Sequence, residues 1–336
     1  MSTKKSFAVV GCGSISGRHA DNIITQGILK AVCDVDFVKA QHLAKNYGAT
    51  PYDALKDMLL YEKELDVAII CTPNGLHAAQ TILCLHNKLN VLCEKPLCIK
   101  GEDGINMIHA ASMSEKQLFI VKQNRFNRSV LDVKALLYDK GLGKIFSFQI
   151  NGFWNRPREY YSDSWRGCKD LDGGILYTQF SHFIDLMYWL LGDIASVEAN
   201  IFNYNHPDIQ IEDTVTAVVN LQSGATGTLH FTTNTYGKNM EGSLTIFGER
   251  GTIKIGGEYL NTIEYATVRD KTLINELQPV QANDYGFYKG SMSNHDKVYN
   301  ELFKALDDKP HELPDIYDAV KTVEIIEKIY AAAAKH

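Results

Sequence analysis

The sequence predicts two domains: an N-terminal α/β domain with a parallel, doubly wound sheet, and a C-terminal α+β domain with a large, mainly antiparallel open sheet. Short apolar runs alternate with helical patterns over the first 122 residues, and longer runs separated by hairpin turns follow. With 336 residues and 45% hydrophobic content, the chain can also fill two cores. We therefore expect domains at 1–122 and 123–336, and the C-terminal helix can pack back on the first domain.

The N-terminal strands are expected in five short apolar runs, each followed by a helical pattern. These runs are residues 7–10, 29–33, 67–71, 91–93 and 118–121. Parallel strands need such helical connections, so this alternation of strands and helices favours a parallel sheet with helices on both faces.

The C-terminal domain begins with a helical pattern at 130–138 and the turn Gly141-Leu142-Gly143. Hairpin turns are expected at Ser223-Gly224 and Glu249-Arg250-Gly251. The strands they separate are expected at 145–150, 215–221, 226–232 and 243–247, and helices at 295–306 and 314–334 close the chain. The hairpins indicate antiparallel pairing.

A glycine turn after the first strand predicts a dinucleotide site. Gly11 and Gly13 lie in the turn, Ser14 and Ile15 open the next helix, and the third glycine is displaced to Gly17. Such a helix N-terminus presents N–H groups to a pyrophosphate. Asp34 follows Gly11 by 23 residues, where a carboxylate accepts the ribose hydroxyls and repels a 2′-phosphate. We expect NAD as the cofactor, although a glycine turn of another α/β fold remains open.

Composition excludes other classes of partner. The net charge is −6 and the pI is about 6.0, so nucleic acid and anionic membranes are not expected partners. The chain has no membrane-length apolar run and no secretory pattern at its start, and we expect it in the cytoplasm. Seven cysteines form no C-x-x-C pair, so neither a metal site nor a disulfide is expected.

Two further loops follow buried strands and carry polar side chains. The first contains Thr72, Asn74 and His77, and the second contains Glu94 and Lys95. Ligand residues gather at the carboxyl ends of parallel strands, so we expect these side chains at the cofactor. A plain connector with a helix cap and a solvated surface lysine are the alternatives.

A histidine in the second domain is a candidate general base. One helix is expected from Thr178 to Leu191, in which His182 and Asp185 share a polar face opposite the apolar stripe. A carboxylate three residues away can orient an imidazole and raise its basicity. A structural helix histidine is the alternative.

These residues carry a family resemblance that covers almost the whole chain. The Gly11 turn, Cys71-Thr72-Pro73, Glu94-Lys95-Pro96 and the Gly173-Gly174 helix with His182 resemble the glucose-fructose oxidoreductase, inositol dehydrogenase and rhizopine-catabolism family. The resemblance implies a Rossmann domain, and it places Lys95 and His182 on either side of the sugar carbon that gives up hydride. Many relatives have Asp four residues before that histidine, where this chain has Thr178.

A narrower similarity points to the UDP-N-acetylglucosaminuronate 3-dehydrogenases of lipopolysaccharide O-antigen synthesis. It is carried by 121–125, 153–161, 165–167 and 241–248. A nucleotide sugar with phosphates and a carboxylate needs cations and aromatic rings. Substrate residues are expected at Lys95, Arg156, Tyr160, Tyr161, Thr178, Gln179 and His182, and Gln123, Trp165 and Arg166 are expected at the cofactor. Arginines beside tyrosines also occur in subunit interfaces.

The resemblance implies that Lys95 stabilises the C3 oxygen, that His182 assists proton removal, and that Asp185 orients His182 while hydride passes to nicotinamide. Which of Lys95 and His182 takes the proton stays open. An inositol or other sugar dehydrogenase, an NAD-dependent glycosidase and a non-catalytic NAD-binding sensor are the alternatives. The resemblance further implies a homo-oligomer, a dimer or a tetramer.

Overall fold

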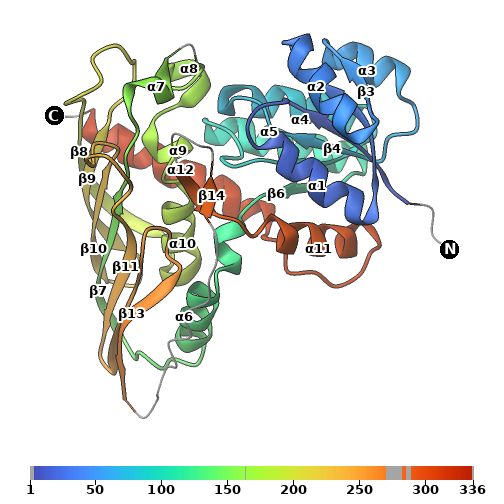
Figure 1. The fold of residues 1–336 in the computed structure, drawn as a ribbon. Helices are drawn as coiled ribbons and strands as arrows, with labels where there is room; N and C mark the ends of the chain where they lie inside the picture. Colours follow the sequence, from blue (N-terminus) through green and yellow to red (C-terminus); the bar gives the residue numbers. More distant parts are fainter. Residues whose placement is uncertain (1–3, 163, 270–281, 285–288, 335–336) are drawn as a thin grey trace. The chain divides into compact units, whose positions relative to one another are not determined.

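The computed structural model describes residues 4–162, 164–269, 282–284 and 289–334 (Figure 1). The chain divides into two compact units. Unit 1 comprises Met1–Lys122 and His295–Val323, and unit 2 comprises Gln123–Asn294 and Glu324–His336. The division therefore falls after Lys122, and a second segment near the C-terminus belongs to unit 1.

Unit 1 contains a six-stranded sheet in the order β3-β2-β1-β4-β5-β6. All of its neighbouring strands pair in parallel, which confirms the predicted doubly wound sheet. The strands are β1 (Ser6–Val10), β2 (Ile28–Cys33), β3 (Thr50–Tyr52), β4 (Val67–Ile70), β5 (Asn90–Cys93) and β6 (Leu118–Ile120). The order reverses between β1 and β4, and ligands of such sheets bind at that point.

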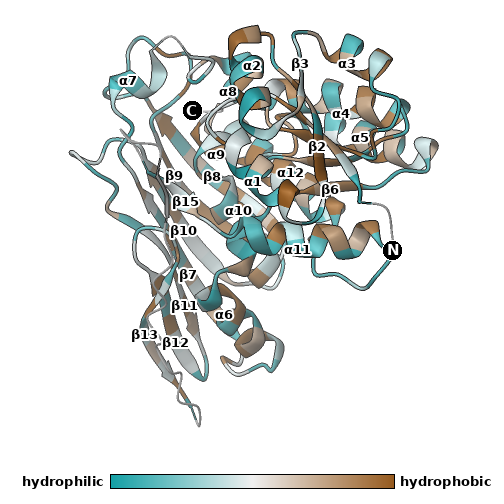
Figure 2. Cartoon of the chain, turned by 45° about the vertical axis from the view of Figure 1, so that its right-hand side comes forward, coloured by the Kyte–Doolittle hydropathy of each residue, from teal (hydrophilic) through white to brown (hydrophobic). Residues whose placement is uncertain are grey.

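Helices cover the sheet of unit 1. They are α1 (Ser16–Gln26), α2 (Phe37–Tyr47), α3 (Leu55–Tyr61), η1 (Asn74–Leu76), α4 (His77–His86), α5 (Gly101–Ser114), α11 (His295–Leu306) and the first part of α12 (Ile316–Ala333). Helix α1 packs on α11, and α4 packs on α5. Figure 2 shows hydrophobic strands in this sheet, and the strand residues Phe7–Val10 are almost wholly buried.

Unit 2 contains a seven-stranded sheet in the order β13-β12-β11-β7-β10-β9-β8. Only the β7 and β10 pair is parallel within it, so the sheet is mainly antiparallel, as predicted. Its strands are β7 (Ile145–Phe153), β8 (Ile194–Phe202), β9 (Thr214–Leu221), β10 (Thr226–Thr232), β11 (Glu241–Gly248), β12 (Gly251–Gly256) and β13 (Thr262–Val268), and β14 (Ala282–Asp284) pairs separately with β15 (Lys289–Met292).

One face of this sheet packs against helices through aromatic side chains. The ring of Phe180 stacks on Phe231 of β10 at 4.8 Å between centroids, and Phe183 meets the same ring edge-on. A Cβ at Gly152 would lie 2.6 Å from the Phe180 ring, so β7 needs glycine there. The helical elements are η2 (Gln123–Phe126), α6 (Arg128–Tyr138), α7 (Arg158–Tyr161), α8 (Lys169–Asp172), α9 (Ile175–Thr178), α10 (Ser181–Leu191) and the end of α12.

The single helix predicted from Thr178 to Leu191 is wrong. Helix α9 ends at Thr178, and α10 begins at Ser181. The face opposite the apolar stripe is buried as well, because His182 and Asp185 are each 1% exposed. Helix α10 is buried on most of its circumference, so the periodicity of its apolar residues does not distinguish a core face from a solvent face.

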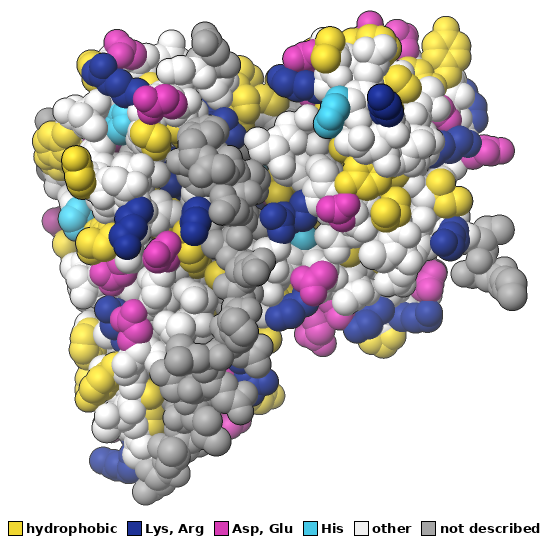
Figure 3. All heavy atoms as spheres, in the orientation of Figure 1, with side chains coloured by type: hydrophobic (Ala, Val, Ile, Leu, Met, Phe, Trp, Pro, Cys, Tyr) yellow, Lys and Arg dark blue, Asp and Glu magenta, His cyan; other side chains and the backbone are white. Residues whose placement is uncertain are grey.

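Acidic and basic side chains lie interspersed on the face drawn in Figure 3. Within the part of the chain that the structure describes, no helix combines the length and apolar character needed to cross a membrane.

Candidate active site residues in the two units

The predicted glycine turn lies at the switch point of the sheet in unit 1. Gly11 has φ of +93°, and a Cβ there would lie 2.7 Å from the carbonyl carbon of Cys71 and 2.8 Å from the backbone nitrogen of Thr72. A side chain would force apart the ends of β1 and β4, so this position needs glycine. Gly13 is exposed, and a Cβ there would meet nothing within 4 Å. The turn thus leaves room above it before α1 begins.

Asp34 joins this turn from the end of β2. Its Oδ2 accepts a hydrogen bond from the N–H of Cys12 at 2.7 Å, and its Oδ1 accepts one from Asp36 at 2.8 Å. The carboxylate remains partly exposed. The prediction that places Asp34 beside the glycine turn therefore has the right geometry, and the open turn, the helix N-terminus and the acid together fit a dinucleotide. Ser14 and Ile15 lie in the same turn.

The two remaining loops of unit 1 are connected by His77. Its Nδ1 lies 2.7 Å from the carbonyl oxygen of Pro96, and its Nε2 lies 2.8 Å from the carbonyl oxygen of Thr72. The ring is 1% exposed, and burial lowers its pKa. A neutral imidazole has one N–H and donates to one of these two carbonyls, while its other ring nitrogen lies close to the second. The ring therefore contacts both the loop after β4 and the loop after β5. Asn74 is buried in the first of these loops.

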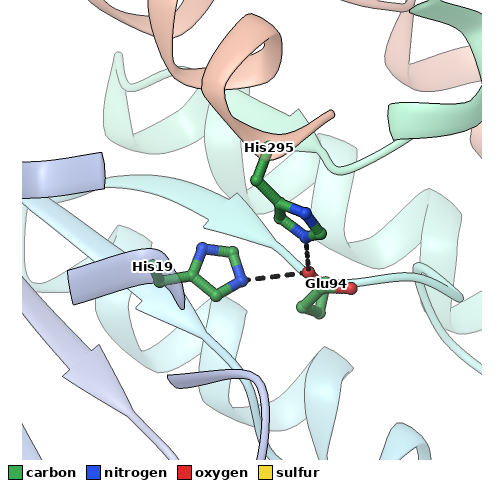
Figure 4. A group of neighbouring side chains, drawn as sticks. All are labelled: His19, Glu94 and His295. Carbon is green, nitrogen blue, oxygen red and sulfur yellow. Dashed lines mark hydrogen bonds and ion pairs between the residues drawn. The ribbon is translucent and has the colours of Figure 1, made fainter. Parts of the chain in front are cut away.

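Glu94 forms the centre of a buried polar network that the sequence did not predict (Figure 4). Its Oε1 lies 2.9 Å from Nε2 of His19 and 3.2 Å from Nε2 of His295. Nδ1 of His19 lies 2.8 Å from the hydroxyl of Tyr299. These side chains come from α1, the loop after β5, and α11. The Glu94 Oε2 accepts the backbone N–H of Lys95 at 3.0 Å.

The charge state of this network follows from its contacts. Burial alone would raise the pKa of Glu94, but hydrogen bonds from His19 and His295 outweigh it and hold the pKa well below its ordinary value. Burial lowers the pKa of His295. The contacts are satisfied when each Nε2–H donates to Oε1 of Glu94 and the Tyr299 hydroxyl donates to Nδ1 of His19.

The group His19, Glu94 and His295 also has the residue types of a metal site, and its three potential ligand atoms lie within 4.8 Å of one another. The separations of 2.9 and 3.2 Å are those of direct hydrogen bonds. Each ring nitrogen that faces the carboxylate can donate to it, so these two contacts are explained without an ion. We therefore assign the network to hydrogen bonding.

In unit 2, Thr178 is tied to a buried acid. Its hydroxyl donates to Oδ1 of Asp172, whose Oδ2 accepts the N–H of Gly167 at 2.9 Å. Asp172 is fully buried, and burial raises its pKa to about 6. Thr178 therefore contributes a hydroxyl that contacts a buried carboxylate from α8.

Asp185 has a partner that the sequence did not indicate. Its two carboxylate oxygens accept hydrogen bonds from Nε and Nη2 of Arg125, both at 2.8 Å. Asp185 and Arg125 are almost fully buried, and the guanidinium also lies 4.9 Å from the ring centroid of Trp189. The orientation of His182 by Asp185 stays a prediction, while the ion pair gives Asp185 a clear structural role. It also neutralises Arg125.

Several predicted substrate residues form one cluster in unit 2. The guanidinium carbons of Arg156 and Arg166 lie 5.2 and 4.5 Å from the centroid of the Tyr160 ring, and the Tyr160 hydroxyl accepts a hydrogen bond from Gln179 at 3.1 Å. Arg166 also lies 5.4 Å from the ring of Trp165. Two cations thus share one aromatic ring, an arrangement that suits an anionic ligand.

Predicted residues in and beside this cluster also have structural partners. The ring of Tyr161 meets that of Tyr160 edge-on at 5.0 Å between centroids, and it lies 4.9 Å from that of His206. Gln123 is buried and donates to Ser291 at 3.0 Å. Arg156 donates to the Asn239 side chain and to the backbone carbonyl of Lys289, so part of its donor capacity is already used.

The buried histidines could have been noticed in the sequence. His19 lies in a stripe with Ser16, Ala20 and Ile23, and His295 lies in one with Val298, Tyr299 and Leu302. Residues at such spacing share the core-facing side of a helix. A histidine in that stripe needs a buried partner, but the spacing does not reveal that the partner is Glu94.

Comparison with known proteins found a matching family model for each of the two domains. The model of the oxidoreductase family's NAD-binding Rossmann fold matches residues 5–122, and the model of the GFO/IDH/MocA C-terminal domain matches residues 130–254. Residues 5–122 therefore form an NAD-binding Rossmann domain. The 2,7-anhydro-N-acetylneuraminate hydratase of Escherichia coli is 28% identical over 191 residues, which are 56% of this chain and 50% of that relative. The alignment thus spans half the length of this curated relative.

Two crystal structures resemble the whole chain. One is the WlbA dehydrogenase of Bordetella pertussis in complex with NADH and UDP-GlcNAcA, at 32% identity and a TM-score of 0.89, covering 99% of this chain and 97% of that chain. The other is the WlbA dehydrogenase of Chromobacterium violaceum with the same two ligands, at 34% identity and a TM-score of 0.90, covering 100% and 95%. From its two domains and this full-length similarity, the chain belongs to the GFO/IDH/MocA family of oxidoreductases.

Proposed function

We propose that the protein is an NAD-dependent dehydrogenase that oxidises the C3 hydroxyl of UDP-N-acetylglucosaminuronic acid to a ketone. The observation that carries this proposal is the similarity, at 32% and 34% identity over nearly the full chain, to two dehydrogenases crystallised with NADH and this nucleotide sugar. The proposal includes a role in surface-polysaccharide synthesis, a cytoplasmic location and a homo-oligomeric state.

The residues of this chain have the chemistry that the reaction requires. Bound NAD would accept the hydride from C3. In the proposed reaction, the Lys95 ammonium donates to the C3 oxygen and stabilises the developing negative charge, while the buried His182 imidazole assists removal of the hydroxyl proton. The glycine turn at Gly11 and the Asp34 carboxylate would hold the cofactor.

The cationic cluster of unit 2 supports an anionic sugar nucleotide over a neutral polyol. Arg156 and Arg166 approach the ring of Tyr160, and Gln179 is fixed to the hydroxyl of the same residue. Phosphates and a carboxylate would gain charge-assisted hydrogen bonds from such guanidinium groups, whereas inositol offers no charge for them to bind. We therefore prefer the nucleotide sugar to inositol as substrate.

A substrate panel tests the proposal. Purified protein is incubated with NAD and, in separate reactions, UDP-N-acetylglucosaminuronate, UDP-N-acetylglucosamine, UDP-glucuronate and myo-inositol. NADH absorbance and product mass are both recorded. We expect NADH and a product two mass units lighter with the first compound, and little reaction with the others. Turnover of inositol alone would contradict the proposed substrate, and release of free sugar without net NADH would favour the NAD-dependent glycosidase.

A further inference from the structure

The two sequence neighbours of Lys95 both contact buried histidine side chains. On its N-terminal side is Glu94, whose carboxylate contacts His19 and His295 and accepts the Lys95 N–H. On its C-terminal side is Pro96, whose carbonyl oxygen contacts His77 at 2.7 Å. The tripeptide Glu94-Lys95-Pro96 is thus fixed at its two ends, while the Lys95 side chain remains partly exposed.

The burial of these imidazoles is informative. His19, His77 and His295 are 0%, 1% and 1% exposed, and they come from α1, α4 and α11. Burying a polar side chain costs free energy that an apolar side chain of similar size avoids, unless hydrogen bonds compensate. Three such rings around one tripeptide therefore indicate that the position of the tripeptide is closely fixed. Hydrogen bonds can fix it because they are directional, whereas apolar contacts are not.

We propose that His19, His77 and His295 are positioning residues that fix the turn from which Lys95 acts. This inference rests on the proposed function in one respect, namely the role of Lys95 in the reaction. His19 and His295 hold the Glu94 carboxylate, which holds the Lys95 N–H, and His77 holds the Pro96 carbonyl to the loop after β4. The histidines act through the backbone on either side of Lys95 and not on the substrate.

Precise position matters for such a group because a displacement of about 1 Å in a reacting site can reduce a rate by roughly 100-fold. The expected effect of loosening the turn is therefore a slower chemical step with nearly unchanged cofactor binding. The Gly11 turn and Asp34, which would hold NAD, form no hydrogen bond to Glu94 among those of the described residues.

The first experiment measures amide hydrogen exchange of Lys95 by mass spectrometry on peptides that span 93–98, in the full-length protein without ligands. Glu94→Gln and His295→Gln should accelerate exchange of the Lys95 amide by about tenfold or more, because its acceptor is lost or no longer held. His109→Gln, an exposed histidine in the interior of α5, is the matched control and should leave exchange unchanged. Unchanged exchange in both network variants would overturn the proposal.

The second experiment is a double-mutant cycle on single-turnover oxidation of UDP-N-acetylglucosaminuronate. His77→Gln and His295→Gln should each slow wild-type chemistry about tenfold, and His295→Gln should change NAD affinity less than about threefold. In the Lys95→Ala background, the same substitutions should have an effect below about twofold. Additive effects, or a parallel loss of NAD affinity, would show that the histidines do not act through Lys95.

The two experiments separate failure of this inference from failure of the proposed function. If the wild-type protein does not oxidise the nucleotide sugar, the proposed function fails, and the exchange measurement still decides whether the network fixes the turn. Should His295→Gln not fold, Glu94→Gln preserves side-chain size and supplies the same exchange measurement. Stoichiometric metal in the purified wild-type protein, measured by elemental analysis, would overturn the hydrogen-bonded arrangement of His19, Glu94 and His295.

Discussion

Replacing Asp185 with Asn should destabilise unit 2 because it leaves the Arg125 cation buried without a counter-charge. Both hydrogen bonds in the pair measure 2.8 Å, and the two side chains are 6% and 1% exposed. Removing one partner of such a pair costs about 3–5 kcal/mol. With a urea m-value of about 2–3 kcal/mol/M, the unfolding midpoint should fall by roughly 1–2 M.

A matched control lies a few residues from Arg125. Arg128 and Asp132 form the same type of pair at i,i+4, but Arg128 is 69% exposed, so Asp132→Asn should cost only about 0.3–0.5 kcal/mol. All three tryptophans lie in unit 2, and their fluorescence during urea unfolding reports on this unit. A midpoint for Asp185→Asn equal to that for Asp132→Asn would show that the buried ion pair does not stabilise unit 2, and Asp185 would keep only the predicted role of orienting His182.

Four further predictions test the cofactor site, the reaction and one buried acid. Asp34 should make NAD bind at least about tenfold more tightly than NADP, because its carboxylate repels the 2′-phosphate of NADP. Asp34→Ala should reduce this difference in affinity when both cofactors are titrated. Equal affinities of the wild-type protein for the two cofactors would contradict the role of Asp34. Gly11→Ala should weaken NAD binding by at least about tenfold, because its Cβ would meet Cys71, while Gly17→Ala, which meets nothing within 4 Å, should bind NAD normally by calorimetry. Lys95→Ala and His182→Ala should each slow single-turnover oxidation by about 100-fold or more with similar NAD affinity, and near-normal chemistry in His182→Ala would make that histidine structural. Burial raises the pKa of Glu212 from 4.5 to about 7, so the folded state keeps this proton up to a higher pH than the unfolded state does. The free energy of unfolding should therefore fall as the pH rises from about 5 to 7.5, and Glu212→Gln should reduce that fall by on the order of 2–3 kcal/mol. Identical pH profiles of stability for the wild-type protein and the variant would contradict the assignment.

The fold was largely predictable because its signals are local. Apolar runs, glycine turns and helical spacing predicted the class of both sheets, although β8 and β13 lie outside the expected runs, and helix α11 spans the expected residues His295–Leu306. Strand β3 escaped prediction because it has three residues, Thr50-Pro51-Tyr52, which offer no periodicity. The break between α9 and α10 was not predicted, because apolar residues continue through Phe180. The helical pattern of the sequence is therefore unbroken at the residues where the backbone leaves the helix.

The sequence indicated candidate site residues, but few of the partners that hold them in place. The Gly11 turn and Asp34 follow a known spacing, and the structure joins them through the Cys12 N–H. The pairing of Arg125 with Asp185 spans 60 positions, and that of Glu94 with His295 spans 201. No local pattern specifies partners at such separations, because the tertiary fold and not the sequence spacing brings them into contact.

Oxidation at C3 of the sugar would transfer the hydrogen of C3 to the cofactor, and isotopic labelling can follow that transfer. UDP-N-acetylglucosaminuronate carrying deuterium at C3 is incubated with the protein and unlabelled NAD for a single turnover, and both products are analysed by mass spectrometry. We expect deuterium in the reduced cofactor and a keto sugar that has lost it. Reduced cofactor without deuterium, beside an oxidised sugar that retains the label, would place the oxidation at another carbon and contradict the proposed function.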